Sequence, residues 1–365
     1  MRKLFDTALS VTAGILIFSI GTAIWLLPSS DFSEEENRAL ATISLPRLSD
    51  IADGSFSEEL GDFFRDRLPL RLEFIRLRTY TELLLLKGEN NGVLFCRDGY
   101  LLDRGEYESL DRARESISEV DALTQYLESL DIPTAVAYVP RGIDVMESKL
   151  PALYHGNAKD ALELLPTGAA FADLLAPLKA AADNGKYVWF RTDHHWTSHG
   201  AYIAYTELSS VLSYTPYEKD FFTVQRVSED FLGSIYSRAG CVAYSNDTIE
   251  LYRYEGDELY RVTIDGEEMT GGLYFPDRLD NKDKYAVFLG GNYAHLTVES
   301  TTDTDRPRLT VIKDSYANSL VPFLALHFDI ELIDPRYYSS PEEYAQILKN
   351  AHRVLILQGI DTIAK

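Results

Sequence analysis

The sequence predicts an α/β fold, and three observations lead to this class. Apolar runs without polar alternation, such as 133–139 and 308–313, are typical of parallel strands that are covered on both faces. Amphipathic helical patterns separate these runs, and such alternation is the signature of α/β architecture. Between about 221 and 300 the runs instead alternate around turns such as Asp265-Gly266, which predicts a β-rich, antiparallel insertion.

The charge balance limits the classes of partner. The 365 residues include 57 acidic and 35 basic side chains, for a formal net charge of -22. Such a field repels nucleic acid and anionic lipid, so we expect neither as a partner of the main body. A polyanionic polysaccharide could still bind in a local basic cleft. The cysteines Cys96 and Cys241 allow one disulfide or none, and they lack the number and spacing of a zinc site.

The N-terminus carries an apolar run, 8–27, that follows the basic Arg2 and Lys3. At about 1.5 Å per residue in a helix this run spans roughly 30 Å, the thickness of a bilayer core. We therefore expect a transmembrane signal-anchor, with residues 1–7 in the cytoplasm and the main domain outside the membrane. A cleaved signal peptide is the alternative, although no typical cleavage site precedes Pro28.

The remaining elements follow from periodicity and from punctuation by Gly and Pro. Residues 28–90 are expected to form a linker and a helical segment, because helical patterns begin near Phe56 and Pro69. Residues 91–365 are expected to form one domain that contains the insertion. Within it we predict a hairpin at 93–102, helices at 110–130, 201–212, 320–327 and 341–350, and strands at 133–139, 187–190, 285–289, 308–313, 330–333 and 354–357.

The loop 191–200 concentrates residues that can do chemistry. It holds three of the seven histidines and lies between a predicted strand and a helix that is entered through Thr197 or Ser198, where α/β proteins place their sites. Ser315 directly follows another buried strand, as the nucleophile of a hydrolase does. A serine hydroxyl needs a base, and the base needs a carboxylate to fix its tautomer.

Asp193 and His195 share one face of an extended segment, whereas His194 points elsewhere. We therefore predict a triad of Ser315, His195 and Asp193, with His194 as a support or substrate contact. Two alternatives stay open. Asp193, His195 and His199 have a spacing that can bind zinc, although we expect no metal. Ser315 could equally be an ordinary helix cap, and His199 could simply pack on Trp196.

Further candidates follow other predicted strands. Gly291 and Asn292 offer oxyanion donors, or else form a tight turn. Arg141 and Arg336 could hold a sugar carboxylate or phosphate, or form surface salt bridges. Trp196 could stack on a sugar ring, or support the loop as a buried side chain.

The motif Asp193-His194-His195-Trp196 resembles the signature of the bacterial DHHW proteins, and blocks at 187–196, 288–293, 312–323 and 334–338 are similar to that family's other blocks. The family is similar to the SGNH-hydrolase-like proteins of alginate O-acetylation. The resemblance implies an SGNH-hydrolase-like (flavodoxin-like), mostly parallel sheet with Ser315 as nucleophile, His195 as base and Asp193 as orienting acid. Where those relatives have a small residue before the serine, this chain has Asp314, whose charge would oppose an adjacent oxyanion unless it turns away.

The same resemblance implies an activity. It is an extracytoplasmic transfer of an acetyl group to hydroxyls of a cell-envelope polysaccharide, without a cofactor. A membrane-bound O-acyltransferase would supply the acyl group across the bilayer. The alternatives are a carbohydrate esterase, in which water is the acceptor, and a non-catalytic polysaccharide-binding or scaffold protein of envelope assembly.

Overall fold

The computed structural model of the chain describes residues 2–26, 30–104, 110–152, 154, 170–269, 272–303, 305–338 and 340–363. The chain divides into two compact units. The first comprises Met1–Asn90 with Ser237–Val242, and the second comprises Asn91–Tyr236 with Ala243–Lys365.

The first unit is mainly helical. Its helix α1 contains an apolar segment, Phe5–Leu26, that is long enough to cross a membrane by length and composition. The Trp25 and Phe63 rings lie 5.5 Å apart, so the end of α1 packs on α3. The predicted helices near Phe56 and Pro69 are present. The elements are α1 (Arg2–Leu26), β1 (Phe32–Ser33), β2 (Arg38–Ala39), α2 (Leu48–Ala52), α3 (Ser55–Asp66), α4 (Arg71–Leu84) and β3 (Glu89–Asn90).

The second unit is built on a seven-stranded sheet with the order β10-β9-β11-β13-β12-β14-β6. Its strands are β6 (Thr134–Val139), β9 (Tyr260–Ile264), β10 (Glu267–Met269), β11 (His295–Ser300), β12 (Arg308–Lys313), β13 (Asp329–Ile333) and β14 (Val354–Gly359). The four strands β13, β12, β14 and β6 pair in parallel, whereas β11, β9 and β10 add antiparallel pairings at one edge. The sheet is therefore mixed with a parallel core, which corrects the expectation of a mostly parallel sheet.

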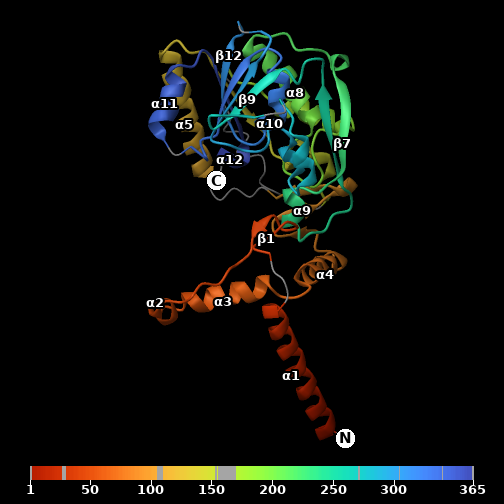
Figure 1. The fold of residues 1–365 in the computed structure, drawn as a ribbon. Helices are drawn as coiled ribbons and strands as arrows, with labels where there is room; N and C mark the ends of the chain where they lie inside the picture. The colour runs from red at the N-terminus through yellow and green to blue at the C-terminus, as the bar shows by residue number, and fades with distance from the viewer. Residues whose placement is uncertain are drawn as a thin grey trace. The chain divides into compact units, whose positions relative to one another are not determined.

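Helices cover both faces of this sheet (Figure 1). Helices α8 (Ser198–Leu212) and α10 (Ala317–Leu324) pack on one face, and α5 (Leu110–Ser129) and α11 (Pro341–Lys349) pack on the other. Neighbouring residues of one strand belong to different cores: Val311 faces α8 and α10, whereas Ile312 faces α5 and α11. This two-sided burial explains the apolar runs in the sequence.

The predicted insertion is divided between two sheets. Strands β7 (Thr223–Phe231) and β8 (Asp247–Arg253) form an antiparallel pair of their own. Strands β9, β10 and β11 instead extend the main sheet, because β11 pairs with β13. The other elements of the chain are β4 (Val93–Phe95), β5 (Leu101–Asp103), α6 (Gly142–Val145), α7 (Leu175–Asp183), α9 (Ser234–Arg238), α12 (Ile360–Ile363) and the 3-10 helices η1 (Arg97–Gly99), η2 (Glu147–Lys149), η4 (Lys219–Phe221), η5 (Pro276–Asp280) and η6 (Lys284–Val287).

Two predicted strands are wrong. The run 187–190 is buried, but its only ladder contact among the described residues is an isolated bridge from Trp189 to Trp196. The run 285–289 lies largely within the 3-10 helix η6. Both runs are apolar because their side chains are buried, and burial alone does not determine the backbone conformation.

Candidate active site

Two loops of the second unit meet at the candidate site. One follows β12, which ends at Lys313, so that Ser315 lies just before α10. The other precedes α8 and is closed at its base by the bridge between Trp189 and Trp196. Thr197 caps α8 by accepting a hydrogen bond from the Gly200 N–H, as expected from the sequence.

The two loops bring together the three side chains that the sequence pointed to. The His195 Nε2 atom lies 2.8 Å from the Ser315 hydroxyl oxygen. On the other side of the ring, Nδ1 lies 2.5 Å from the Asp193 Oδ1 atom. A carboxylate only accepts hydrogen bonds, so Nδ1–H donates to Asp193 and Nε2 is left to accept from the serine hydroxyl. Exposed fractions of 4% for Asp193, 5% for His195 and 8% for Ser315 leave this chain of hydrogen bonds largely shielded from water.

Asp193 is held by a second segment of the chain. Its Oδ2 atom accepts hydrogen bonds from the backbone N–H of Ser234 at 2.8 Å and from the Ser234 hydroxyl at 3.0 Å. Burial alone would raise the pKa of Asp193, but His194, His195 and the Ser234 N–H together lower that pKa well below its usual range. The carboxylate is therefore ionised and can orient His195.

His194 plays a different part from His195. Since the Ser234 hydroxyl gives its proton to Asp193, it accepts from the His194 Nδ1 atom, which lies 2.7 Å away. Burial, followed by the charge of His195, lowers the pKa of His194 to about 4, so this ring is neutral at pH 7. The rings of His194 and His195 are 3.8 Å apart. His194 thus lies outside the Ser315 contact and supports Asp193 through Ser234.

Aromatic side chains enclose the histidine. The Tyr285 ring stacks on the His195 ring at 3.8 Å and 7°, and its hydroxyl donates to the Ser315 carbonyl oxygen at 3.3 Å. Tyr316 closes another side and donates its hydroxyl proton to the His194 carbonyl oxygen at 2.7 Å. These rings fix the orientation of His195 by packing as well as by hydrogen bonds.

Asp314 is turned toward β14 and α12. Its Oδ2 atom accepts hydrogen bonds from the Gly359 N–H at 2.6 Å and from the Thr362 hydroxyl at 2.8 Å. Its Oδ1 atom accepts from the Tyr316 N–H at 3.1 Å. The Ser315 N–H, by contrast, donates to no partner among the described residues, so it is free to meet an oxyanion.

The segment that contains Gly291 and Asn292 is fastened to the start of α10. The Asn318 amide nitrogen donates to the Gly291 carbonyl oxygen and to the Asn292 Oδ1 atom, both at 3.1 Å. The buried Lys313 ammonium also donates to Asn292 Oδ1, at 3.0 Å. Burial lowers the pKa of Lys313 to about 8, although Asp334 at 3.8 Å opposes this shift. The side-chain oxygen of Asn292 is therefore occupied and its amide nitrogen is left as a donor.

The other expected contact residues have structural partners. Arg141 is buried and forms an ion pair with the buried Asp144 at 2.9 Å, so it takes part in a salt bridge, as in the alternative given for it, but in the interior rather than at the surface. Arg336 is partly exposed and pairs with Asp334 at 2.6 Å. Trp196 is fully buried and donates to the Ser319 hydroxyl at 2.9 Å, which removes it from contact with a sugar. The buried location fits its alternative role as a support.

Three side chains that hold this site together were not predicted from the sequence, namely Ser234, Tyr285 and Asp247. Asp247 is buried and holds the start of the loop, because it accepts from the backbone N–H groups of Arg191 and Thr192, both at 2.7 Å. All three lie 38 or more residues from the motif along the chain. The Gly233-Ser234 step before a helix is a cap signal, but it does not reveal the partner.

Asp193, His194 and His195 also offer ligand atoms within 4.8 Å of one another, as a metal site requires. This set differs from the one expected from spacing, since His199 contacts the Tyr252 hydroxyl at 3.2 Å. The facing atoms of Asp193 and the two histidines already bind one another or Ser234. The geometry therefore favours a proton relay over a set of open metal ligands.

Family models cover this region. The model described as DHHW protein matches residues 178–333. The model described as the SGNH hydrolase-like domain of the acetyltransferase AlgX matches residues 88–254. The resemblance inferred from the motif and its surrounding blocks is confirmed over the matched residues, which include Asp193 and His195 in both models.

Particular relatives share part of the sequence or the fold. The probable alginate O-acetylase AlgJ of Pseudomonas fluorescens is 25% identical over 173 residues, which cover 45% of this chain and 44% of that protein. The chain thus matches less than half the length of this curated relative. Among solved structures, Bacillus cereus PatB1 superposes with a TM-score of 0.62 at 21% identity over 75% of this chain and 97% of that one. A DHHW family protein from Eubacterium siraeum DSM 15702 gives 0.59 at 21% identity over 76% and 93%. These two likenesses support the fold.

Proposed function

We propose that the chain transfers an acetyl group to hydroxyls of a cell-envelope polysaccharide through a covalent acyl-serine. The observation that carries the proposal is the continuous hydrogen-bonded chain from Ser315 through His195 to Asp193, at 2.8 and 2.5 Å. A serine hydroxyl is a weak nucleophile until a positioned base removes its proton, and this arrangement supplies that base.

The first half-reaction forms the acyl-serine. His195 Nε2 takes the Ser315 proton as Oγ attacks the carbonyl carbon of the acyl donor. The negative charge that develops on the carbonyl oxygen is met by the Ser315 N–H, and the Asn292 amide nitrogen is the further candidate donor. As the bond to the leaving group breaks, His195 returns its proton to that group, and Asp193 stabilises the imidazolium in between.

The second half-reaction repeats these roles with another nucleophile. A sugar hydroxyl gives its proton to His195 and attacks the acyl-serine, and the proton then returns to Ser315 as the ester is released. If water takes the place of the sugar, the same residues give an esterase. The name of the AlgJ relatives supports a polysaccharide as the acceptor. Since Arg141 is paired in the interior, Arg336 is the remaining candidate for an anionic group of the substrate.

The N-terminal helix supports a location at the membrane. We assign α1 as a single-pass anchor that holds the second unit outside the cytoplasm, where envelope polysaccharides are modified. Acetyl groups must then cross the bilayer, and a membrane-bound O-acyltransferase is the class of partner that would supply them.

The test uses the full-length chain in detergent with a small acetyl ester as donor. Ser315→Ala and His195→Ala should each lower kcat/KM for hydrolysis by at least about a thousandfold, because triad members act as a unit. Ser210→Ala and His352→Ala replace residues of the same types at exposed positions and should leave the rate unchanged. Unaltered turnover in Ser315→Ala would exclude it as the nucleophile.

The acyl-serine and the acceptor can be examined separately. PatB1 has been solved with a sulfonyl adduct, which suggests the reagent. A sulfonyl fluoride should add one sulfonyl group to the wild type at Ser315 and none to Ser315→Ala, as measured by peptide mass spectrometry. Acetylated oligosaccharide formed from donor and acceptor would identify a transferase, and acetate alone would identify an esterase. A wild-type protein that neither turns over nor labels would favour the non-catalytic alternative.

A further inference from the structure

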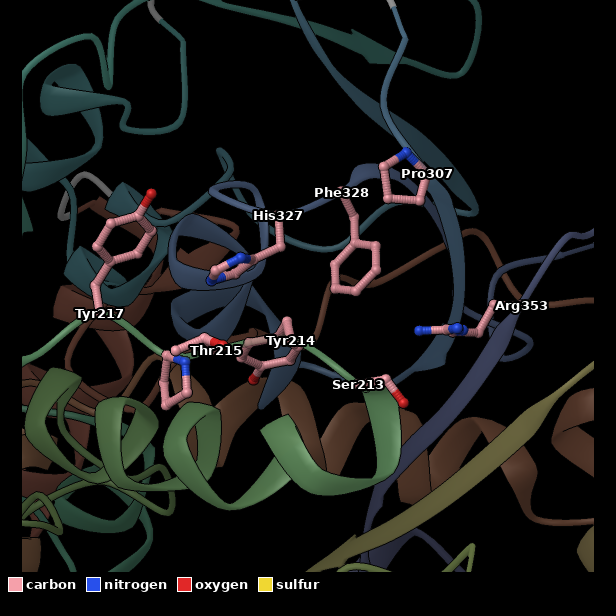
Figure 2. Close-up of a pocket in the computed structure, with 9 residues that line it drawn as sticks. Ser213, Tyr214, Thr215, Tyr217, Pro307, His327, Phe328 and Arg353 are labelled. Atoms are coloured by element: carbon pink, nitrogen blue, oxygen red, sulfur yellow. The ribbon is translucent and has the colours of Figure 1, made fainter.

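A separate cavity of about 570 Å³ lies at the other end of the parallel strands. Pro307, Phe328 and Arg353 line it from positions just before β12, β13 and β14, and the loop 213–217 after α8 forms the facing wall (Figure 2). The volume falls within the range of sites for small organic ligands, roughly 300–1,000 Å³.

This cavity is remote from Ser315. Ser315 follows the carboxyl end of β12, whereas Pro307 precedes its amino end. The strand's six residues rise by about 3.3 Å each, which separates the two places by roughly 20 Å. A ligand in the cavity therefore cannot be the group that reacts at Ser315, and the cavity needs a function of its own.

A chain of hydrogen bonds determines which nitrogen of the His327 ring carries a proton that the cavity wall can donate. The Tyr217 backbone N–H donates to the Tyr205 hydroxyl oxygen at 2.8 Å, and the His327 Nε2 atom lies 2.8 Å from the same oxygen. The hydroxyl proton is thus given to Nε2, so the other ring nitrogen of His327 carries the proton. Burial, followed by the charge of Arg306, lowers the pKa of His327 to about 4, which keeps this ring neutral. Its Nδ1–H has no partner among the described residues, so it remains available as a donor.

Aromatic rings form the rest of the wall. Tyr214 stacks on His327 at 4.4 Å, which fixes the ring in place. At the rim Tyr217 stacks on Phe221 at 4.2 Å, and these two side chains are 40% and 42% exposed. His327 also stacks on Tyr217, at 5.5 Å, so the Tyr217 ring lies between two others and presents its edge and hydroxyl rather than a free face. Aromatic rings that are held by stacking offer such contacts to a sugar at low entropic cost.

The charge of the cavity is opposite to that of the protein. Although the chain carries a formal net charge of -22, the described residues that line the cavity include Arg353 and no carboxylate. The Arg353 Nη1 atom donates to the Leu212 carbonyl oxygen, which anchors the guanidinium. Its other nitrogens have no partner among the described residues and can donate to an anion.

We propose that this cavity is a second glycan-binding site for an anionic polysaccharide, in which one sugar unit lies beside Tyr217 and His327 and the carboxylate of a neighbouring unit reaches Arg353, at the other end of the cavity (Figure 2). The proposal goes beyond acetyl transfer, because binding here requires no reaction at Ser315. Such a site would hold a polysaccharide chain while another of its units is at Ser315. The single cation and the aromatic rim fit a carboxylated sugar better than a polyphosphate, which would need several cations.

The test measures binding of mannuronate oligomers to the full-length chain in detergent by isothermal titration calorimetry, with mannose oligomers of equal length as the neutral probe. The wild type should bind the charged oligomer at least about tenfold more tightly than the neutral one. Tyr217→Ala and Arg353→Gln should each weaken that binding at least about tenfold, the scale of one lost contact. Tyr244→Ala and Arg226→Gln replace exposed residues of the same types outside the cavity and should bind as the wild type does.

Two further measurements separate this proposal from the proposed function. Ser315→Ala should keep its affinity for the oligomer, and Tyr217→Ala should keep its rate on a small acetyl ester and its thermal unfolding midpoint. The second site is overturned if the wild type binds no mannuronate oligomer, if it binds both probes equally, or if both cavity variants bind as tightly as the wild type. Each of these results would leave the test of Ser315 unaffected.

Discussion

The Asp193 carboxylate joins two segments of the candidate site, because its two oxygens accept hydrogen bonds from His195 and from Ser234. One oxygen fixes the tautomer of the base, and the other is anchored to the start of α9. The residue therefore acts on the chemistry through His195 and on the loop through Ser234.

Asp193→Asn should lower kcat for ester hydrolysis by roughly 10³- to 10⁴-fold, since an amide at this position stabilises the wrong tautomer of His195. The KM should change little. The lowered pKa of Asp193 in the folded chain also contributes to stability at pH values above the unfolded value of about 4, and that contribution is lost as the pH falls. The difference in free energy of unfolding between wild type and variant should therefore shrink below about pH 4. A difference that is constant with pH would contradict this assignment.

Gly233 is the second residue on which the carboxylate depends. A Cβ atom at this position would lie 2.3 Å from the Asp193 Cβ and Oδ2 atoms, closer than any packing allows. Gly233→Ala should therefore displace Asp193 and lower kcat at least about tenfold, while the KM for a small ester stays near the wild-type value. Gly88→Ala, at a position with open space around it, is the matched control and should be as active as the wild type. Full activity of Gly233→Ala would show that the loop adapts without consequence.

At this scale the sequence predicted the residue types and the chain order of Asp193, His195 and Ser315. A strand-to-helix loop is recognisable from local patterns, and a serine after a buried strand is too. Ser234, Tyr285 and Gly233 were not predictable, because their contacts join segments that are distant in sequence. A buried tyrosine stacked on a histidine looks like any other core residue until the fold places it.

At the scale of elements, β8 helps to hold the candidate site although it is not a strand of the seven-stranded sheet. Its first residue, Asp247, accepts hydrogen bonds from two backbone N–H groups, from the Thr192 hydroxyl at 2.6 Å and from the Tyr187 hydroxyl at 2.5 Å. The β-rich insertion is thus hydrogen-bonded, through Asp247, to the start of the loop that carries His195.

Asp247→Asn should weaken this connection, because an amide nitrogen would face a donor where a carboxylate oxygen now accepts. The variant should lose about 1–3 kcal/mol of unfolding free energy and a measurable part of kcat. Asp277→Asn changes a mostly exposed carboxylate of the same insertion and should alter neither quantity. Chemical denaturation and ester hydrolysis on the same samples provide the comparison, and a fully active Asp247→Asn would remove β8 from the site.

The wrongly predicted strands have one physical explanation. The sequence identifies burial well, so the strands β6, β12, β13 and β14 were located almost to the residue. The segments 187–190 and 285–289 are also apolar and mostly buried, yet neither is a strand of a sheet. The alternating pattern also predicted antiparallel strands in the insertion. It did not predict that β8 pairs with β7 whereas β11 joins the main sheet, because local patterns do not encode long-range strand pairing.

At the scale of the whole molecule, α1 has a large apolar surface whose exposure to water would be unfavourable. Ile15, Ile17 and Phe18 are 62%, 71% and 77% exposed, and only 6% of the apolar window is buried within the protein. Exposed apolar area of this extent requires another covering, and the hydrocarbon core of a bilayer matches the length of the helix. Arg2 and Lys3 precede it and favour a cytoplasmic N-terminus.

The full-length chain should therefore stay in the membrane fraction after carbonate extraction, and a chain that starts at residue 30 should be recovered in the soluble fraction with its ester hydrolysis retained. A C-terminal tag should be cleaved by protease added to intact spheroplasts, whereas an N-terminal tag should be protected until the membrane is lysed. A reversed pattern of protection would place Ser315 in the cytoplasm, away from any envelope polysaccharide.

The N-terminal sequence of the purified protein should begin at Met1. A sequence that begins near Ser29 or Ser30 would instead identify a cleaved signal peptide, because the anchoring helix would then be absent from the mature protein.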